Sequence, residues 1–212
     1  MTVSPRVREV LSRLEETRWK YYNLHPASGE VLALLARVSR PQRVIEVGTS
    51  NGYSAILLGE AARESGGQVV TIERNSHVAA EAQRNIAEAG LQDVVTVLSG
   101  SAYKVLRDLP GPWDFAFLDA TKQEYVGYLD RILPKFASPA LLVADNLLSH
   151  EEELAEFRER VAAEPRLDAT ILPIGTGLLV GVYDQPPSEP AHAERAAVAL
   201  NEVLAAVQAP AR

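Results

Sequence analysis

Acidic and amide side chains follow four of the apolar segments that the sequence predicts as strands. Glu46 lies near the end of the first segment and Glu73 ends the second, while Asp119 and the pair Asp145 and Asn146 follow two later ones. Ligands of a parallel sheet bind outside the carboxyl ends of its strands, so these side chains are expected at one rim. Taken singly, each is better explained as a turn or a helix cap. Their convergence favours a binding site.

Asp119, Asp145 and Asn146 would supply two carboxylates and an amide oxygen, without histidine or cysteine. Such oxygen ligands suit Mg²⁺, and Mn²⁺ and Ca²⁺ accept them as well. Lys122 lies three residues after Asp119, at the start of a predicted helix. An ammonium beside a divalent cation can lose its proton near neutral pH, whereas a guanidinium cannot. Lys122 is therefore a candidate general base, with a solvated surface lysine as the alternative.

A glycine turn connects the first predicted strand to a helix. Gly48 and Gly52 are four residues apart, and Tyr53, Ile56 and Leu57 then recur at helical spacing. Such a turn lets a ligand approach bare backbone beside a helix N-terminus. The dinucleotide fingerprint needs a third glycine and a G-x-G start, which are missing here, so a pyrophosphate ligand is disfavoured. The alternative is that the glycines only make a turn.

Two carboxylates, Glu46 and Glu73, flank this turn. Glu73 occupies the position at which an acidic residue binds the ribose hydroxyls in βαβ nucleotide units. Negative charge repels phosphates, but it accepts hydrogen bonds from ribose and favours a sulfonium ligand that carries an amino group. These features predict S-adenosylmethionine (SAM) rather than NAD as the cofactor.

Strands and helices alternate along the chain, which predicts an α/β fold with a doubly wound, mostly parallel sheet. Two final apolar stretches, 169–172 and 178–183, are close enough in sequence to pair antiparallel. Ser149 and Glu152 form a predicted capping box for the helix that starts at these residues and precedes the two stretches. The other predicted strands are 68–72, 94–98, 113–118 and 140–144, and the predicted helices include 3–22, 28–38, 101–109 and 122–136.

The composition fits one globular domain with a sizeable core, since 47% of the 212 residues are hydrophobic. We expect this domain to span residues 1–184, with residues 1–40 as a helical lid, and a cytoplasmic location. The sequence of residues 185–212 predicts a proline-rich linker followed by a helix. We expect the apolar stripe of this helix to pack on its own domain or on a second subunit of a homodimer. The net charge of −7 opposes nonspecific binding to nucleic acid or an anionic membrane.

Four sequence segments resemble the metal-dependent O-methyltransferases, a family that includes catechol and caffeoyl-CoA O-methyltransferases. They are VIEVGTSNGYSA at 44–55, AGLQDVVTVL at 89–98, FLDATKQEY at 117–125 and ADN at 144–146. The ordered combination is specific, although each motif alone is weak. The resemblance covers roughly residues 23–183.

The resemblance implies a Rossmann-like sheet of seven strands, with helices on both faces and the last strand antiparallel. It implies SAM as the cofactor and Asp119, Asp145 and Asn146 as metal ligands, and it matches Lys122 to the proposed base of catechol methylation, with Asp119 beside it in the catalytic group. The residues expected around the cofactor are Leu24, Glu46, Gly48, Thr49, Ser54, Glu73, Ala102 and Asp119.

The chain departs from this family in its substrate loop, because only Leu147, Leu148 and Ser149 precede the next predicted helix. Thr176 also stands where many relatives have Asp. The expected reaction is methylation of a small catechol-like or phenolic substrate. Two alternatives stay open: methylation of a hydroxylated uridine in transfer RNA, and a non-catalytic SAM-binding or assembly protein. The complete set of Asp119, Lys122, Asp145 and Asn146 argues against the last.

Overall fold

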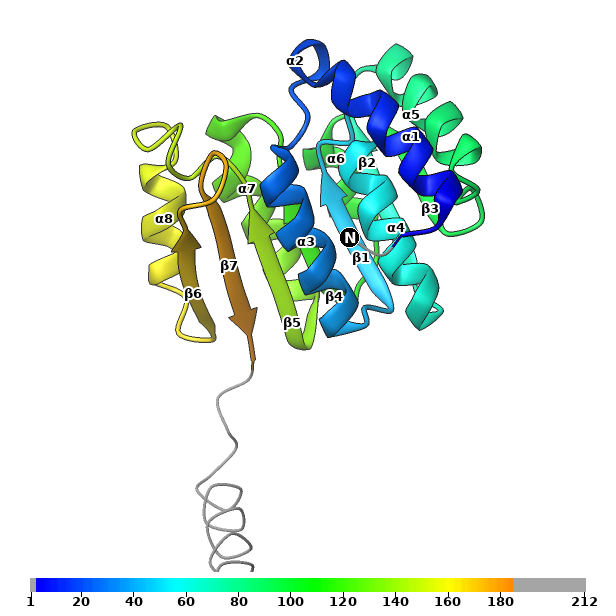
Figure 1. Cartoon of the computed structure of the whole chain (residues 1–212). Helices are drawn as coiled ribbons and strands as arrows, with labels where there is room; N and C mark the ends of the chain where they lie inside the picture. The colour runs from blue at the N-terminus through cyan, green and yellow to red at the C-terminus, as the bar shows by residue number, and fades with distance from the viewer. Residues whose placement is uncertain (1–2, 185–212) are drawn as a thin grey trace, which may run out of the picture.

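A seven-stranded sheet forms the centre of the computed structural model, which describes residues 3–184 (Figure 1). The strand order is β3-β2-β1-β4-β5-β7-β6. The pairs among β1 to β5 are parallel, and β7 runs antiparallel to both β5 and β6, so the predicted topology is confirmed. The strands are β1 (Arg43–Val47), β2 (Gln68–Glu73), β3 (Val95–Ser99), β4 (Trp113–Leu118), β5 (Phe136–Ala144), β6 (Leu167–Leu172) and β7 (Leu178–Tyr183).

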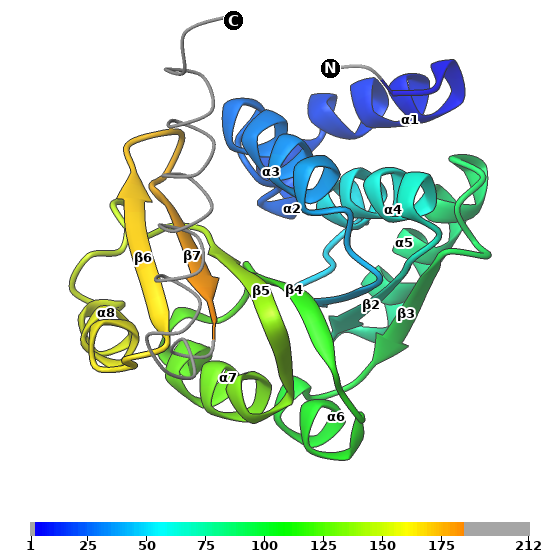
Figure 2. The ribbon, with the colours of Figure 1, turned by 90° about the horizontal axis from the view of Figure 1, so that it is seen from below.

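Helices cover both faces of the sheet. The α-helices are α1 (Pro5–Glu16), α2 (Arg18–Tyr21), α3 (Pro26–Ser39), α4 (Tyr53–Ser65), α5 (Ser76–Glu88), α6 (Ala102–Asp108), α7 (Tyr125–Ile132) and α8 (Ala155–Ala162), with 3₁₀ turns η1 (Lys122–Glu124) and η2 (Leu133–Lys135). Helices α3, α4 and α5 lie on one side and α6, α7 and α8 on the other (Figure 2). The buried apolar residues form two hydrophobic clusters. Val44 and Phe115 belong to one cluster and Ile45 and Ala116 to the other, because side chains alternate along a strand. Burial on both faces explains why these strands are nearly continuous apolar runs.

The N-terminal segment is two helices rather than the single predicted helix over 3–22. Val7, Val10, Leu11 and Leu14 of α1 are buried, whereas α2 buries none of its residues. Thr17 separates the helices, and its hydroxyl donates to the Leu14 carbonyl at 3.2 Å. The buried apolar stripe therefore ends at Leu14, and the prediction of one continuous helix to residue 22 is wrong.

Two further helix predictions also need correction. The segment predicted as one helix over 122–136 consists of η1, α7 and η2, and β5 begins at Phe136, four residues before its predicted start. Pro134 lies inside η2 and has no backbone N–H with which to continue an α-helix. The capping box at Ser149 and Glu152 does not form, since α8 begins at Ala155 after Leu154 as its N-cap.

The predicted linker and C-terminal helix at 185–212 lie outside the described residues. Within residues 3–184, none of the helices combines the length and the apolar character that crossing a membrane would require.

Candidate active site

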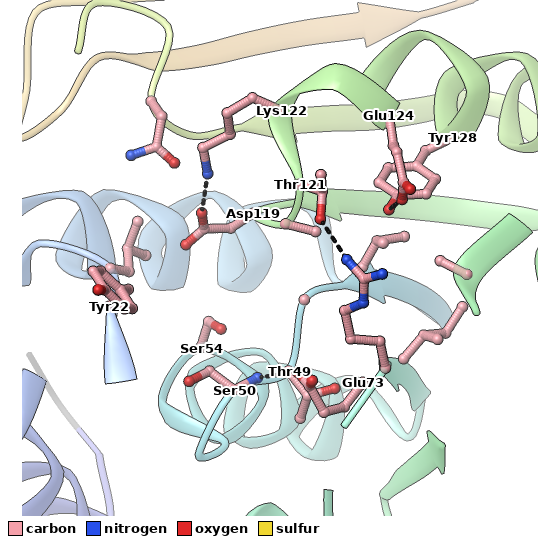
Figure 3. A pocket seen from close by; sticks show the side chains of 18 of the residues that line it. Tyr22, Thr49, Ser50, Ser54, Glu73, Asp119, Thr121, Lys122, Glu124 and Tyr128 are labelled. Atoms are coloured by element: carbon pink, nitrogen blue, oxygen red, sulfur yellow. Dashed lines mark hydrogen bonds and ion pairs between the residues drawn. The ribbon is translucent and has the colours of Figure 1, made fainter. Parts of the chain in front are cut away.

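A cavity of about 600 Å³ opens at the carboxyl ends of β1, β2 and β4. Its volume is in the range of small-molecule and cofactor sites. Nine of the residues predicted from sequence line it: Leu24, Gly48, Thr49, Ser54, Glu73, Ala102, Asp119, Lys122 and Asn146. Two others, Glu46 and Asp145, are buried and do not line the cavity. Figure 3 shows Glu73 and Lys122 reaching into this space from different elements.

The glycine turn brings the ends of β1 and β4 into direct contact. Gly48 has φ +102°, and a Cβ added to it would lie 1.9 Å from the carbonyl oxygen of Asp119. No side chain fits there, so bare backbone forms this part of the cavity wall. Gly52 has φ +95° and starts α4, whose N-terminus faces the same cavity through Tyr53 and Ser54. The sequence prediction of a backbone-lined cradle agrees with this geometry.

Both carboxylate oxygens of Glu73 accept a backbone hydrogen bond, one from the glycine turn and one from the N-cap residue of α5. Oε2 accepts from the Ser50 N–H at 3.0 Å, and Oε1 accepts from the Asn75 N–H at 2.9 Å. A carboxylate offers about four acceptor sites, so each oxygen keeps the capacity to accept another hydrogen bond. This arrangement suits the two hydroxyls of a ribose.

We predict that Glu73→Ala weakens SAM binding by about 1–3 kcal/mol, the cost of losing hydrogen bonds to a charged acceptor. Isothermal titration calorimetry measures this change directly. Glu88→Ala is the control, because Glu88 is an exposed carboxylate paired with Arg13 on the protein surface. If Glu73→Ala binds SAM with the affinity of the unmodified protein, the prediction that Glu73 binds the ribose is wrong.

Glu46 lies in the protein interior instead of facing the cavity. Its side chain is fully buried, and its Oε2 accepts a hydrogen bond from the Thr71 hydroxyl at 2.5 Å. The Thr71 hydroxyl is also 2.6 Å from that of Thr49, which lines the cavity. Glu46 therefore reaches the glycine turn through two threonines. Burial raises the pKa of the Glu46 carboxyl to about 7.

This raised pKa predicts a loss of stability with rising pH. Between the ordinary pKa of 4.5 and the folded value of about 7, the folded protein binds more protons than the unfolded chain. The contribution of Glu46 to the free energy of unfolding therefore falls as pH rises through this window. The difference in free energy of unfolding between Glu46→Gln and the unmodified protein should therefore shift by about 3 kcal/mol in favour of the variant between pH 4.5 and pH 8. Urea unfolding of the cofactor-free proteins checks this, and a difference that is independent of pH would contradict it.

The ends of β1, β4 and β5 bring the two predicted metal-ligating carboxylates together. The Asp119 N–H donates to Val47 O at 2.9 Å, and the Asp145 N–H donates to Leu118 O at 3.0 Å. Burial raises the pKa of Asp119, against the opposing charge of Lys122. Burial and then the charge of Asp119 raise the pKa of Asp145 to about 7. Two buried like charges of this kind are stabilised by a bound cation.

Asn146 supplies an acceptor that the protein itself leaves unused. It adopts φ +73°, and its Oδ1 is buried with no hydrogen-bond partner among residues 3–184. Buried polar atoms are nearly always satisfied, so this unpaired oxygen of a residue that lines the cavity is available to a ligand. No group of three His, Cys, Asp or Glu side chains suited to a metal occurs in the described part of the chain. The predicted set with its amide oxygen nevertheless fits a hard cation such as Mg²⁺.

Lys122 lies in the cavity wall and is not a solvated surface lysine. Its Nζ lies 3.2 Å from Asp119 Oδ1, a contact drawn in Figure 3. It also lies 3.5 Å from the Tyr125 hydroxyl. Only 14% of its side chain is exposed, and it lines the cavity. The 3₁₀ turn η1 presents it there, directly after the end of β4.

The cavity also contains residues that the sequence reasoning did not identify as cofactor or metal ligands. His150 follows Asn146 by four residues, and its N–H donates to Asn146 O at 3.0 Å. Tyr22 has φ +53° and is 89% exposed beside the cavity. The hydrophobic periodicity of the sequence does not reveal which non-glycine residue adopts a positive φ, so the position of Tyr22 could not be predicted from it. The other unassigned lining residues include Tyr21, Asn23, Ser50, Tyr53, Arg74, Ser101, Thr121, Glu124 and Tyr128.

A cavity at the carboxyl ends of the strands is where ligand-binding proteins with an open α/β sheet of this kind hold their ligands. Comparison with known proteins narrows the class. The O-methyltransferase family model matches residues 3–182. The chain belongs to this O-methyltransferase family.

Relatives and solved structures agree with this assignment. The chain is 33% identical over 175 residues to a catechol O-methyltransferase of Niastella koreensis, covering 75% of this chain and 79% of the relative. It is 26% identical over 199 residues to a caffeoyl-CoA O-methyltransferase of Stellaria longipes, covering 82% of each chain. The crystal structure of a Bacillus cereus O-methyltransferase in complex with SAH matches with a TM-score of 0.76 at 29% identity, covering 87% of this chain and 93% of that one. The protein is a SAM-dependent O-methyltransferase of the catechol and caffeoyl-CoA type.

Proposed function

We propose that this enzyme methylates a hydroxyl of a small aromatic diol, in a reaction that requires a divalent metal ion. One observation carries the proposal: Asp119, Lys122 and the unpaired Oδ1 of Asn146 lie at the wall of the same cavity as Glu73. The cavity thus offers acceptors for a cofactor and, separately, oxygen ligands beside a candidate base. A pure SAM-binding protein has no need of the second group.

The cofactor would be held by Glu73 at the ribose and by the glycine turn, with Leu24, Ser54 and Ala102 around it. When bound, SAM supplies an electrophilic methyl group on a sulfonium. Methyl transfer requires the acceptor oxygen, the methyl carbon and the sulfur to lie in line, and the residues of the cavity wall would hold the two reactants in that alignment. Alignment of this kind supplies much of the acceleration of such a transfer, because oriented groups react with large effective molarities.

Asp119, Asp145 and Asn146 would hold the metal ion, with Mg²⁺ as the first candidate and Mn²⁺ or Ca²⁺ as alternatives. A divalent cation supplies Lewis acidity, which lowers the pKa of a hydroxyl beside it. A divalent cation beside Lys122 would favour loss of a proton from its ammonium group to solvent, and the neutral amine would then accept the proton of the acceptor hydroxyl at Nζ. Asp119 would orient the lysine through their 3.2 Å contact. Only 14% of the Lys122 side chain and 16% of the Asp119 side chain are exposed, so few water molecules can reach the pair.

The acceptor class can be tested with labelled SAM and a panel of catechol, a caffeoyl ester and bulk transfer RNA, each with Mg²⁺ and with EDTA. We expect transfer to the diols only, stopped by EDTA. Transfer to RNA alone would replace the proposal with the transfer RNA alternative, which the net charge of −7 opposes. Cofactor binding without transfer to any acceptor in the panel would overturn the small aromatic diol as the substrate class. A homodimer and a cytoplasmic location stay predictions from the sequence.

A further inference from the structure

The turn between β6 and β7 packs against the loop that carries Asp145 and Asn146. From this contact we infer that Thr176 is a positioning residue, which orients Asp145 as a metal ligand. The inference rests on the metal site proposed above. It concerns a residue that lies outside the cavity lining and touches neither the proposed cofactor nor the substrate.

Thr176 is the side-chain donor to Asp145. Its Oγ1 lies 2.8 Å from Asp145 Oδ1 and 2.8 Å from Asp145 Oδ2. A hydroxyl has one hydrogen, so it donates to one of these oxygens at a time and leaves the other available as a ligand. Asp145 is itself buried, and a buried carboxylate without a donor is costly.

The backbone of the same turn fixes the loop that follows Asn146. The N–H groups of Leu148 and Ser149 both donate to Thr176 O at 3.0 Å, and the Leu147 N–H donates to Gly177 O at 2.9 Å. These bonds hold the loop and the Asp145 side chain against one turn. The same bonds explain why the predicted capping box fails, since the N–H of Ser149 is already committed to Thr176.

The turn is fixed on its other side by the start of α3. A Cβ added to Gly175 would lie 2.3 Å from Ser28 Oγ and 2.9 Å from His25 Cβ, and a Cβ on Gly177 would lie 2.5 Å from the Leu148 backbone nitrogen. Both glycines have positive φ, +58° and +92°. The residues on both sides of Thr176 therefore pack closely against neighbouring segments, which restricts the movement of the turn that carries its hydroxyl.

A threonine at this position orients the ligand without adding charge. Asp119 at the cavity wall and the buried Asp145 already bring two carboxylates together, and a third acidic side chain here would repel both. A neutral hydroxyl supports the ligand by donating to it. Partners of this kind, one step removed from a metal ion, typically change metal affinity by about 10- to 100-fold when removed.

The affinity for Mn²⁺ tests the inference without an activity assay. It is measured from the decrease in the electron paramagnetic resonance signal of unbound Mn²⁺ as the protein binds the ion. We expect Thr176→Val and Thr176→Ala to weaken Mn²⁺ binding by about 10- to 100-fold, and Thr176→Ser to retain the affinity of the unmodified protein. Thr170→Val is the matched control, because Thr170 is an exposed residue of the same hairpin. SAM affinity in EDTA, measured by calorimetry, should be unchanged in all four variants.

The two ways of failing are distinguishable. Equal Mn²⁺ affinity in Thr176→Ala and the unmodified protein would overturn the positioning role and leave the metal site standing. Absence of Mn²⁺ binding by the unmodified protein would overturn both. The alanine variant keeps the comparison valid if valine at 176 prevents folding, because alanine introduces no added bulk.

Discussion

Replacing Asp145 and Asn146 together by alanine is expected to lower metal-dependent kcat by about 10³-fold or more, since Lewis acidity at such a site is worth several kcal/mol. The change removes one carboxylate and the unpaired amide oxygen, and it leaves Asp119 as the only remaining ligand of the proposed set. SAM binding should stay nearly intact, because neither side chain faces the ribose end of the cavity. Labelled methyl transfer and calorimetry measure the two effects separately.

Asp168→Ala is the control for this double change. Asp168 is an exposed carboxylate on β6, on the same part of the sheet but away from the cavity. It should retain both activity and cofactor binding. Full activity in the double variant would exclude Asp145 and Asn146 as metal ligands.

Lys122→Met is expected to lower kcat by about 10²- to 10⁴-fold, the usual contribution of a positioned general base. The KM for SAM should change little. Lys122→Arg distinguishes a base from a positive charge, because a guanidinium keeps the charge and does not lose its proton near neutral pH. We expect the arginine variant to be as impaired as the methionine variant.

Lys104→Met provides the matched control, since Lys104 is an exposed lysine on α6. Its kcat should equal that of the unmodified enzyme. Recovery of activity in Lys122→Arg would assign Lys122 an electrostatic role and leave solvent as the proton acceptor.

The strand ends were predictable because two simple patterns agree. Apolar segments alternate with helical ones, and a polar residue ends each of the segments that stop at Glu73, Asp119 and Asp145. Parallel strands bring such ends together, and the structure places Glu73 and Asp119 at the cavity as expected. The predicted roles of these residues stay predictions until the measurements above are made.

Glu46 shows what the strand pattern leaves out. It stands one residue before the end of β1, on the same face as Val44, so it points into the layer between sheet and helices. Its neighbours across the sheet are Thr71 and Phe117, whose positions depend on strand register. Distance from the strand end alone does not separate a buried carboxylate from one at the rim.

Thr176 and the failed capping box depend on contacts between distant segments. Ser149 and Glu152 have the right spacing for a helix start, but the Ser149 N–H is bonded to Thr176 O, 27 residues later in the chain. Local sequence carries no sign of that partner. The tertiary contact overrides the local preference and delays α8 to Ala155.

The most direct test compares methyl transfer from labelled SAM to catechol and to its mono-methyl ether, each with Mg²⁺ and with EDTA. Catechol has two adjacent hydroxyls, and the ether has one. The proposed site predicts rapid transfer to catechol in Mg²⁺, little transfer to the ether, and loss of activity toward catechol in EDTA. Equal rates for the two acceptors, unaffected by EDTA, would contradict a metal site at Asp119, Asp145 and Asn146.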